Sequence, residues 1–186
     1  MKKQFIILFL LISMHSAIAQ PKTKSVDAYA IATAELAAIK NKTALGIGGY
    51  AGILLNKDWF IALGGSNLLF KHTVNNSSTR FQFNQYGIYA EKHFFNPGNV
   101  RFTTALFAGG GWLNYDSKEA GKKFKRDGDY TYVIQPKIAI TVPVFKFMQL
   151  QVHTAYRFTG GIKSELFSTG NMNGITAGLS LLLGTF

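Results

Sequence analysis

Apolar and polar residues alternate along much of this chain with a period of two. Between residues 147 and 160 the apolar positions are Met148, Leu150, Val152, Tyr156 and Phe158, and the intervening positions carry Gln149, Gln151, His153, Arg157 and Thr159. Residues 130–143 repeat the alternation, with Gln135, Lys137 and Thr141 on the polar side. A period of two predicts β-strands that have one apolar and one polar face.

The alternating segments are separated by turn residues and predict eight strands. The expected ranges are 26–40, 44–55, 59–70, 80–94, 100–115, 130–143, 147–160 and 173–186. The first range is rich in Ala, so a helix is the alternative there, but the even strand number of bacterial single-chain barrels favours a strand. Pro136 forfeits a ladder hydrogen bond in mid-strand and predicts a local bulge. This strand content suits a closed barrel better than an ordinary soluble domain.

Alternation alone does not say which face is inside, because a soluble lipocalin-like barrel turns its apolar face inward. Strand length favours a membrane barrel: about 12 residues at about 3.3 Å each, tilted by about 40°, match a bilayer core about 30 Å thick. Connection lengths also favour it, since short links at 56–58, 96–99 and 144–146 alternate with long polar links at 72–79, 116–129 and 161–172.

Aromatic residues gather near both ends of the expected strands, as in the interfacial girdles of membrane barrels. One end carries Trp59, Phe60, Phe94, Phe95, Phe145, Phe147 and Phe186, and the other carries Trp112, Tyr115, Tyr130, Tyr132, Tyr156 and Phe158. We therefore predict an all-β fold, an eight-stranded antiparallel up-and-down transmembrane β-barrel.

The first residues of the chain predict a cleaved secretory signal peptide over 1–19. Lys2 and Lys3 precede an apolar run of 8 residues at 5–12, and Ala17 and Ala19 occupy the A-x-A positions. The run is shorter than the roughly 20 apolar residues that a spanning helix needs. Residues 20–186 then form the barrel domain, and its expected location is the bacterial outer membrane.

Several stretches of the chain resemble a known family of proteins. They are GIGGYAGILLNKDWFIALGG (46–65), YGIYAEKHFFNPGN (86–99), FAGGGW (107–112), YRFTGG (156–161) and NGITAGLSLLLGTF (173–186). In these stretches the chain resembles small eight-stranded outer-membrane β-barrel proteins of Gram-negative bacteria, and more closely Bacteroidetes-type barrels. The terminal Phe186 is similar to the signal that barrel-insertion machinery reads, which makes that machinery an expected partner. The resemblance implies fold and location but no activity.

Four charged residues fall on faces that we assign to the barrel interior: Glu35, Glu91, Lys137 and Arg157. A lumen of eight strands is just wide enough for side chains to fill it, and unpaired charges there are costly. Opposite charges should therefore pair, with Glu35 and Arg157 as the expected pair. The network is interpreted as a structural plug, with a gate or binding network as the alternative.

The full chain has 20 Lys+Arg against 9 Asp+Glu, and one expected outer loop carries a basic cluster. Lys122, Lys123, Lys125 and Arg126 form this cluster within residues 116–129. Such side chains suit the phosphates of lipopolysaccharide, and a solvated charged loop is the alternative. An outer-membrane location argues against nucleic acid as a partner.

Catalytic chemistry finds little support in the sequence. The absence of Cys excludes Cys-ligated metal sites and thiol catalysis, and no metal site or cofactor is predicted. His72, His93 and His153 show no spacing that matches a nucleophile–base pair. Three hypotheses for function are left: a plugged structural or surface-interaction barrel, a narrow solute channel, and an enzyme at the rim that modifies lipid or peptide.

Overall fold

The computed structural model describes residues 27–39, 42–55, 58–74, 77–95, 100–119, 122–126, 130–161 and 172–185. The predicted signal peptide and Phe186 lie outside the described residues. The strands are β1 (Asp27–Ile39), β2 (Lys42–Leu55), β3 (Trp59–Val74), β4 (Ser77–Phe95), β5 (Arg101–Glu119), β6 (Lys122–Arg126), β7 (Tyr130–Phe145), β8 (Met148–Gly160) and β9 (Gly174–Gly184).

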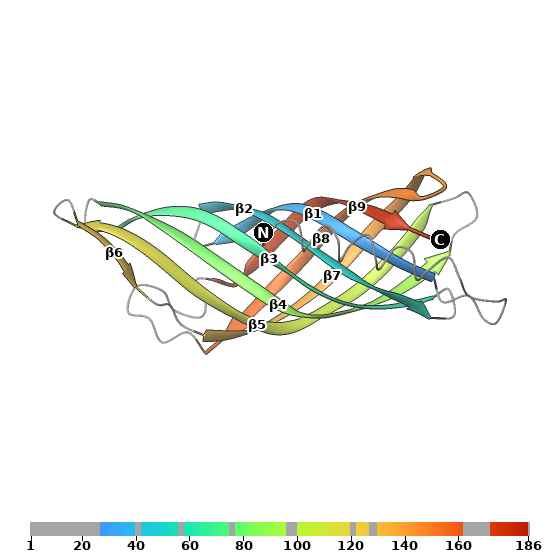
Figure 1. The fold of residues 1–186 in the computed structure, drawn as a ribbon, viewed down its shortest axis with the longest axis horizontal. Coiled ribbons are helices and arrows are strands. Elements are labelled where there is room, and N and C mark those ends of the chain that lie inside the picture. Colours follow the sequence, from blue (N-terminus) through green and yellow to red (C-terminus); the bar gives the residue numbers. More distant parts are fainter. Residues whose placement is uncertain are drawn as a thin grey trace, which may run out of the picture.

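Eight of these strands close into an antiparallel barrel (Figure 1). Within the ring, β1 to β5 and β7 to β9 pair in chain order, β5 pairs with β7, and β9 returns to pair with β1. The short strand β6 pairs with the far end of β5 and does not belong to the ring. The predicted eight-stranded antiparallel barrel is confirmed, and the Ala-rich first segment is a strand, as expected.

The two ends of the barrel differ. At one end, here called the turn end, β2 runs into β3, β4 into β5, and β7 into β8 through a turn at Lys146–Phe147. At the opposite end, here called the hairpin end, β4 and β5 are the longest strands at 19 residues each, β3 pairs with β4 as far as Val74, and β6 pairs with β5 (Figure 1). At the hairpin end, the barrel wall therefore extends further at β3–β6 than at β8, β9 and β1.

Side chains alternate between the outside and the lumen. On β8, Val152 is 55 % exposed while its neighbour Gln151 is 1 % exposed. Large apolar side chains cover the outer surface, and Leu63, Ile138 and Leu179 are further examples. This arrangement is the reverse of a soluble lipocalin-like barrel, whose apolar face lines the interior.

Aromatic side chains are exposed near both ends of the barrel. Trp59, Phe94, Phe145 and Phe147 are exposed towards the turn end, and Tyr130, Tyr132, Tyr156 and Phe158 towards the hairpin end. Trp112 is half-buried and stacks on Tyr86 at 5.2 Å between ring centroids. The expectation that Phe60 belongs to an interfacial aromatic girdle was wrong. Its side chain is fully buried in the lumen and stacks on Tyr29, with 3.8 Å between the ring centroids.

Two other sequence expectations are corrected by the strand register. The links predicted at 72–79 and 116–129 are largely strand, because β3 pairs with β4 as far as Val74 and Ser77, and β5 pairs with β6. Continued backbone pairing outweighs the polar composition of these segments. The bulge predicted at Pro136 is also wrong, since the register shift of β7 against β8 lies between Pro143 and Phe145.

Glycine permits close strand approach on the β3–β5 side. Gly64 pairs with Gly87, and Gly87 pairs with Gly109. A Cβ atom on Gly87 would lie 2.3 Å from the carbonyl oxygen of Ala108, and one on Gly109 would lie 2.1 Å from that of Tyr86. These contacts are too short for any side chain, so glycine allows this wall of the barrel to bend.

Candidate functional site: the polar lumen

The lumen contains a buried ion pair between β4 and β7. Nζ of Lys137 lies 2.7 Å from Oε1 of Glu91, and both side chains are almost completely buried. The Tyr50 hydroxyl, from β2, donates to the same carboxylate oxygen at 2.7 Å and accepts a hydrogen bond from Lys137. Three strands are thus joined across the barrel interior by one ion pair and its tyrosine.

A second polar cluster lies towards the turn end. Arg101 donates to Nδ1 of His93 at 3.1 Å and also to the side-chain carbonyl of Gln149. Because arginine can only donate, Nδ1 is an acceptor, and Nε2 carries the proton of a neutral imidazole. Nε2 lies 3.0 Å from the Tyr29 hydroxyl and 3.6 Å from Oε2 of Glu91. This cluster therefore continues the network from Glu91 towards the turn end.

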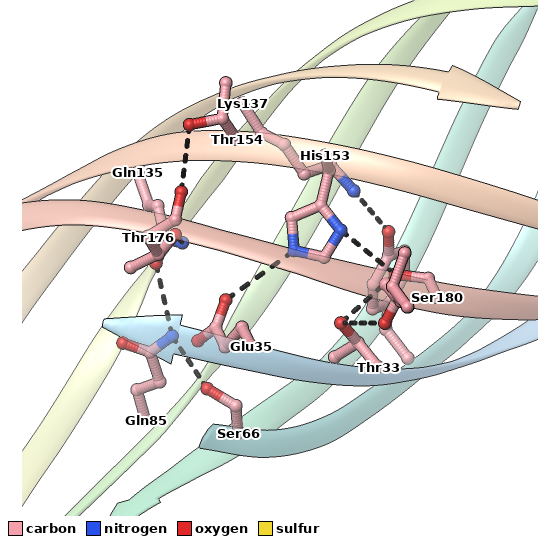
Figure 2. A network of polar contacts seen from close by, with 12 residues as sticks. Thr33, Glu35, Ser66, Gln85, Gln135, Lys137, His153, Thr154, Thr176 and Ser180 are labelled. Carbon is pink, nitrogen blue, oxygen red and sulfur yellow. Dashed lines mark hydrogen bonds and ion pairs between the residues drawn. The ribbon is translucent and has the colours of Figure 1, made fainter. Parts of the chain in front are cut away.

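Amide and hydroxyl groups cross the lumen on the other side of the ion pair (Figure 2). The Gln85 amide donates to the Ser66 hydroxyl at 3.0 Å and to the Gln135 carbonyl oxygen at 3.3 Å. The Gln135 amide in turn donates to Thr176 at 3.3 Å. Hydrogen-bonded side chains from β3, β4, β7 and β9 therefore occupy the part of the lumen that water would fill in an open channel.

Glu35, His153 and Ser180 lie in a row next to these amides (Figure 2). Nε2 of His153 is 3.8 Å from Oε2 of Glu35, and its Nδ1 is 3.2 Å from the Ser180 hydroxyl. The row has the composition of a serine–histidine–acid site. However, Thr33 donates to the carbonyl of Leu179, and Ser180 donates to Thr33.

The direction of these hydrogen bonds argues against an activated serine. Because the Ser180 proton goes to Thr33, His153 is left to donate to Ser180 rather than accept its proton. A general base must be placed to accept the proton of the nucleophile. Ser180 is also only 2 % exposed. The geometry therefore supports a structural cross-link between β1, β8 and β9.

The expected ion pair between Glu35 and Arg157 is not formed, and that prediction was wrong. Arg157 is fully buried, its Nε donates to the carbonyl of Met172 at 3.0 Å, and its guanidinium lies 5.8 Å from the centre of the Phe83 ring. Glu35 has His153 as its nearest ionic partner within the described part of the chain. Glu35 on β1 and His153 on β8 both pair with Gly178 of β9, whereas Arg157 pairs with Gly174.

We predict that Glu35 is energetically coupled to His153 more strongly than to Arg157. A double-mutant cycle of Glu35→Gln with His153→Gln should give a coupling energy of about 0.5–3 kcal/mol, as found for contacting residues. The cycle of Glu35→Gln with Arg157→Gln should give less. Urea unfolding of the barrel in lipid vesicles measures both, and a larger coupling in the second cycle would contradict the assignment.

The structure places Glu35, Glu91, Lys137 and Arg157 inside the barrel, but only Glu91 and Lys137 form an ion pair with each other. Sequence reasoning missed Tyr50 and Gln85, which carry central hydrogen bonds. The alternation offered a signal for Tyr50, since it has the same parity as inward-facing Ala44 and Leu54 on β2.

The basic cluster lies at the hairpin end. Lys122, Lys123, Lys125 and Arg126 all belong to β6, whose backbone pairs with Tyr115–Glu119 of β5. Their side chains, like that of His72, lie outside the described part of the structure. The cluster lies outside the ring of the barrel, on a strand whose backbone pairs with β5.

Among the described residues, no group of three or more His, Asp or Glu side chains is arranged to hold a metal ion. None of the helices found there has the length and hydropathy to cross a membrane.

Among the comparisons with known proteins, the solved structures support the fold. No protein-family model matches the chain, and no curated protein matches it in sequence. Among solved structures, it is similar to Neisserial surface protein A, with 14 % identity, a TM-score of 0.58, and 85 % of this chain and 96 % of that chain covered.

Two further solved structures have the same fold. The N-terminal β-barrel domain of OprF from Pseudomonas aeruginosa matches with 14 % identity, a TM-score of 0.54 and coverage of 85 % of this chain and 96 % of that chain. Ail, the attachment invasion locus protein of Yersinia pestis, matches in complex with the heparin analogue sucrose octasulfate, with 10 % identity, a TM-score of 0.54 and coverage of 87 % and 99 %. The chain therefore has the fold of small bacterial outer-membrane barrels.

Proposed function

We propose that this protein is an integral outer-membrane barrel with a plugged lumen and a role at the cell surface, without catalytic activity. The observation that carries the proposal is the inverted distribution of side chains: apolar residues cover the outside, while a cross-linked polar network fills the inside. Apolar outer surface of this extent is unfavourable in water and favourable in hydrocarbon. The signal peptide predicted at 1–19 and the fold of the neighbours support the same location.

Placement in the membrane and the plug are tested together. The protein should fractionate with outer membranes and migrate faster on gels before boiling than after it, because a folded barrel resists unfolding in detergent. Reconstituted into planar bilayers, it should give no steady conductance. Recovery as a soluble periplasmic monomer would overturn the membrane placement, and stable ion conductance would favour the narrow solute channel instead.

The basic cluster on β6 is the proposed contact for anions at the cell surface. Four cationic residues within five positions lie on β6, which pairs with the end of β5 that extends beyond the barrel ring. Phosphates of lipopolysaccharide are the expected ligands, since Lys and Arg bind phosphate through charge-assisted hydrogen bonds. The sulfated heparin analogue bound to Ail is a related polyanion on a barrel of the same fold.

Replacing Lys122, Lys123, Lys125 and Arg126 together by Gln should weaken binding to lipopolysaccharide-containing vesicles by at least about tenfold, because each cation near an anionic surface contributes about 1 kcal/mol. Co-sedimentation at low salt measures the binding. The control replaces exposed Lys42 and Lys146, which lie outside β6. The control removes two cations and the β6 variant four. A loss of binding free energy in the control about half that of the β6 variant would therefore show that net charge, and not the cluster, drives binding.

The closer resemblance to Bacteroidetes-type barrels and the use of barrel-insertion machinery stay predictions from the sequence. Depletion of that machinery should reduce the folded, fast-migrating form in cells. An unchanged folded fraction after depletion would contradict this expected partner.

A further inference from the structure

Pro136 leaves one backbone carbonyl on β8 without its ladder donor. The ladder between β5 and β7 runs past Pro136 without a gap. The ladder between β7 and β8 keeps its register but omits the pairs Gln135–Arg157 and Pro136–Tyr156. The nitrogen of Pro136 therefore faces β8, and since proline has no N–H, the carbonyl of Tyr156 receives no hydrogen bond from β7.

The same position opens into a groove on the outer wall of the barrel. It has a volume of about 420 Å³ and runs across β5, β7, β8 and β9. Its lining includes Thr104, Pro136, Ile138, Thr154, Tyr156 and Ile175. Small side chains hollow the surface here between larger exposed ones. The volume lies within the range of about 300–1,000 Å³ that natural ligand sites have.

No side chain in the described lining of the groove donates a hydrogen bond to this carbonyl, although Thr104 and Tyr156 carry hydroxyl groups. The hydroxyl of Thr154 donates to the carbonyl of Thr176 at 3.0 Å. Pro136, Ile138 and Ile175 have no side-chain donor. In hydrocarbon a backbone carbonyl without a hydrogen-bond partner is strongly unfavourable. An occupant that combines a hydrocarbon chain with one hydroxyl group would fill the groove and satisfy the carbonyl together.

We propose that this groove binds a hydroxylated acyl chain of lipid A, the membrane anchor of lipopolysaccharide. The chain packs against Pro136, Ile138 and Ile175, and its hydroxyl group donates to the Tyr156 carbonyl. The end of the groove that holds the Tyr156 carbonyl lies in the leaflet at the hairpin end, because Pro136, Tyr156 and Ile175 lie in the half of their strands nearer that end. The other end of the groove reaches Thr104, the fourth residue of β5, so the acyl chain runs from the carbonyl towards the turn end. This proposal rests on the proposed outer-membrane placement, with the hairpin end facing outward.

The experiment uses the purified barrel folded in detergent and native mass spectrometry. The first probe pair is 3-hydroxytetradecanoic acid against tetradecanoic acid at equal concentration. We expect the hydroxy acid to be retained about fivefold better, which corresponds to one net hydrogen bond. The second pair is lipid A against dipalmitoyl phosphatidylglycerol, and we expect lipid A to be retained. Equal retention of the two acids, or preference for phosphatidylglycerol, overturns the proposal.

Two variants separate the hydroxyl contact from the groove itself. Pro136→Val restores an N–H facing Tyr156, so the preference for the hydroxy acid should fall to about one while a chain still binds. Thr154→Trp fills the groove and should abolish retention of both acids. Ile140→Trp, at an outward position outside the groove, and Pro143→Val, at an exposed proline elsewhere on β7, are the matched controls, and both should behave like the wild type.

The comparison of the two acids on the wild-type barrel needs no variant, so poor folding of a variant cannot hide a negative result. A Pro136→Val protein that folds and keeps the hydroxy-acid preference would contradict the role of the Tyr156 carbonyl. Because the barrel is studied in detergent, failure here is distinct from failure of the membrane placement, which fractionation of cells tests.

Discussion

Lys137→Met should lower the free energy of unfolding of the barrel by about 3–5 kcal/mol, because it leaves the buried Glu91 carboxylate without its cation. Glu91 is fully buried, and Lys137 and Tyr50 are the described groups that donate to its Oε1 atom. Water cannot replace the lost cation in a lumen that side chains fill. Urea unfolding in lipid vesicles, followed by tryptophan fluorescence, measures the change.

The chain offers a matched control for this variant in a second Lys–carboxylate pair. Lys92 lies 3.0 Å from Asp58 at the turn end, but both side chains are partly exposed. Lys92→Met should therefore cost about 0–1 kcal/mol, as surface ion pairs do. The double variant Glu91→Gln/Lys137→Met should recover part of the loss, since it removes the stranded charge. Equal effects of Lys137→Met and Lys92→Met would contradict a dry, plugged lumen.

The alternation of β7 and β8 could be predicted from sequence because every second residue differs sharply in polarity. Val152 and Gln151 lie on the faces that their polarity indicates. The position of Phe60 could not be predicted in this way, because an aromatic ring is stable both at a membrane interface and in a packed lumen. Only the parity of β3, with Ala62 also inward, distinguishes the two.

The partners of the lumen charges depend on the stagger of the strands, which the sequence does not show. Glu35 and Arg157 both face inward, yet the register places Glu35 level with His153. The extension of β5 into β6 was missed for a different reason. Residues 116–129 are polar and charged, so they resemble a loop, while the backbone pairing of β6 with β5 does not depend on side-chain polarity.

The outer surface gives the last large effect. Val152→Arg should destabilise the barrel in lipid vesicles by about 2–4 kcal/mol, because a cation near the bilayer midplane meets neither water nor a counter-charge. Val152 is 55 % exposed and lies near the middle of β8. The cost arises in the folded state, since the unfolded chain keeps the Arg in water. Urea unfolding in vesicles again measures the difference.

The depth of the substituted residue provides the control for this prediction. Tyr130 is 82 % exposed at the first position of β7, at the hairpin end. There Tyr130→Arg should cost only about 0–1 kcal/mol, because a charge near the interface reaches water. A cost that depends on depth requires that hydrocarbon surrounds the barrel. If Val152→Arg and Tyr130→Arg cost the same, the apolar outer surface does not face a bilayer, and the proposed membrane placement fails with it.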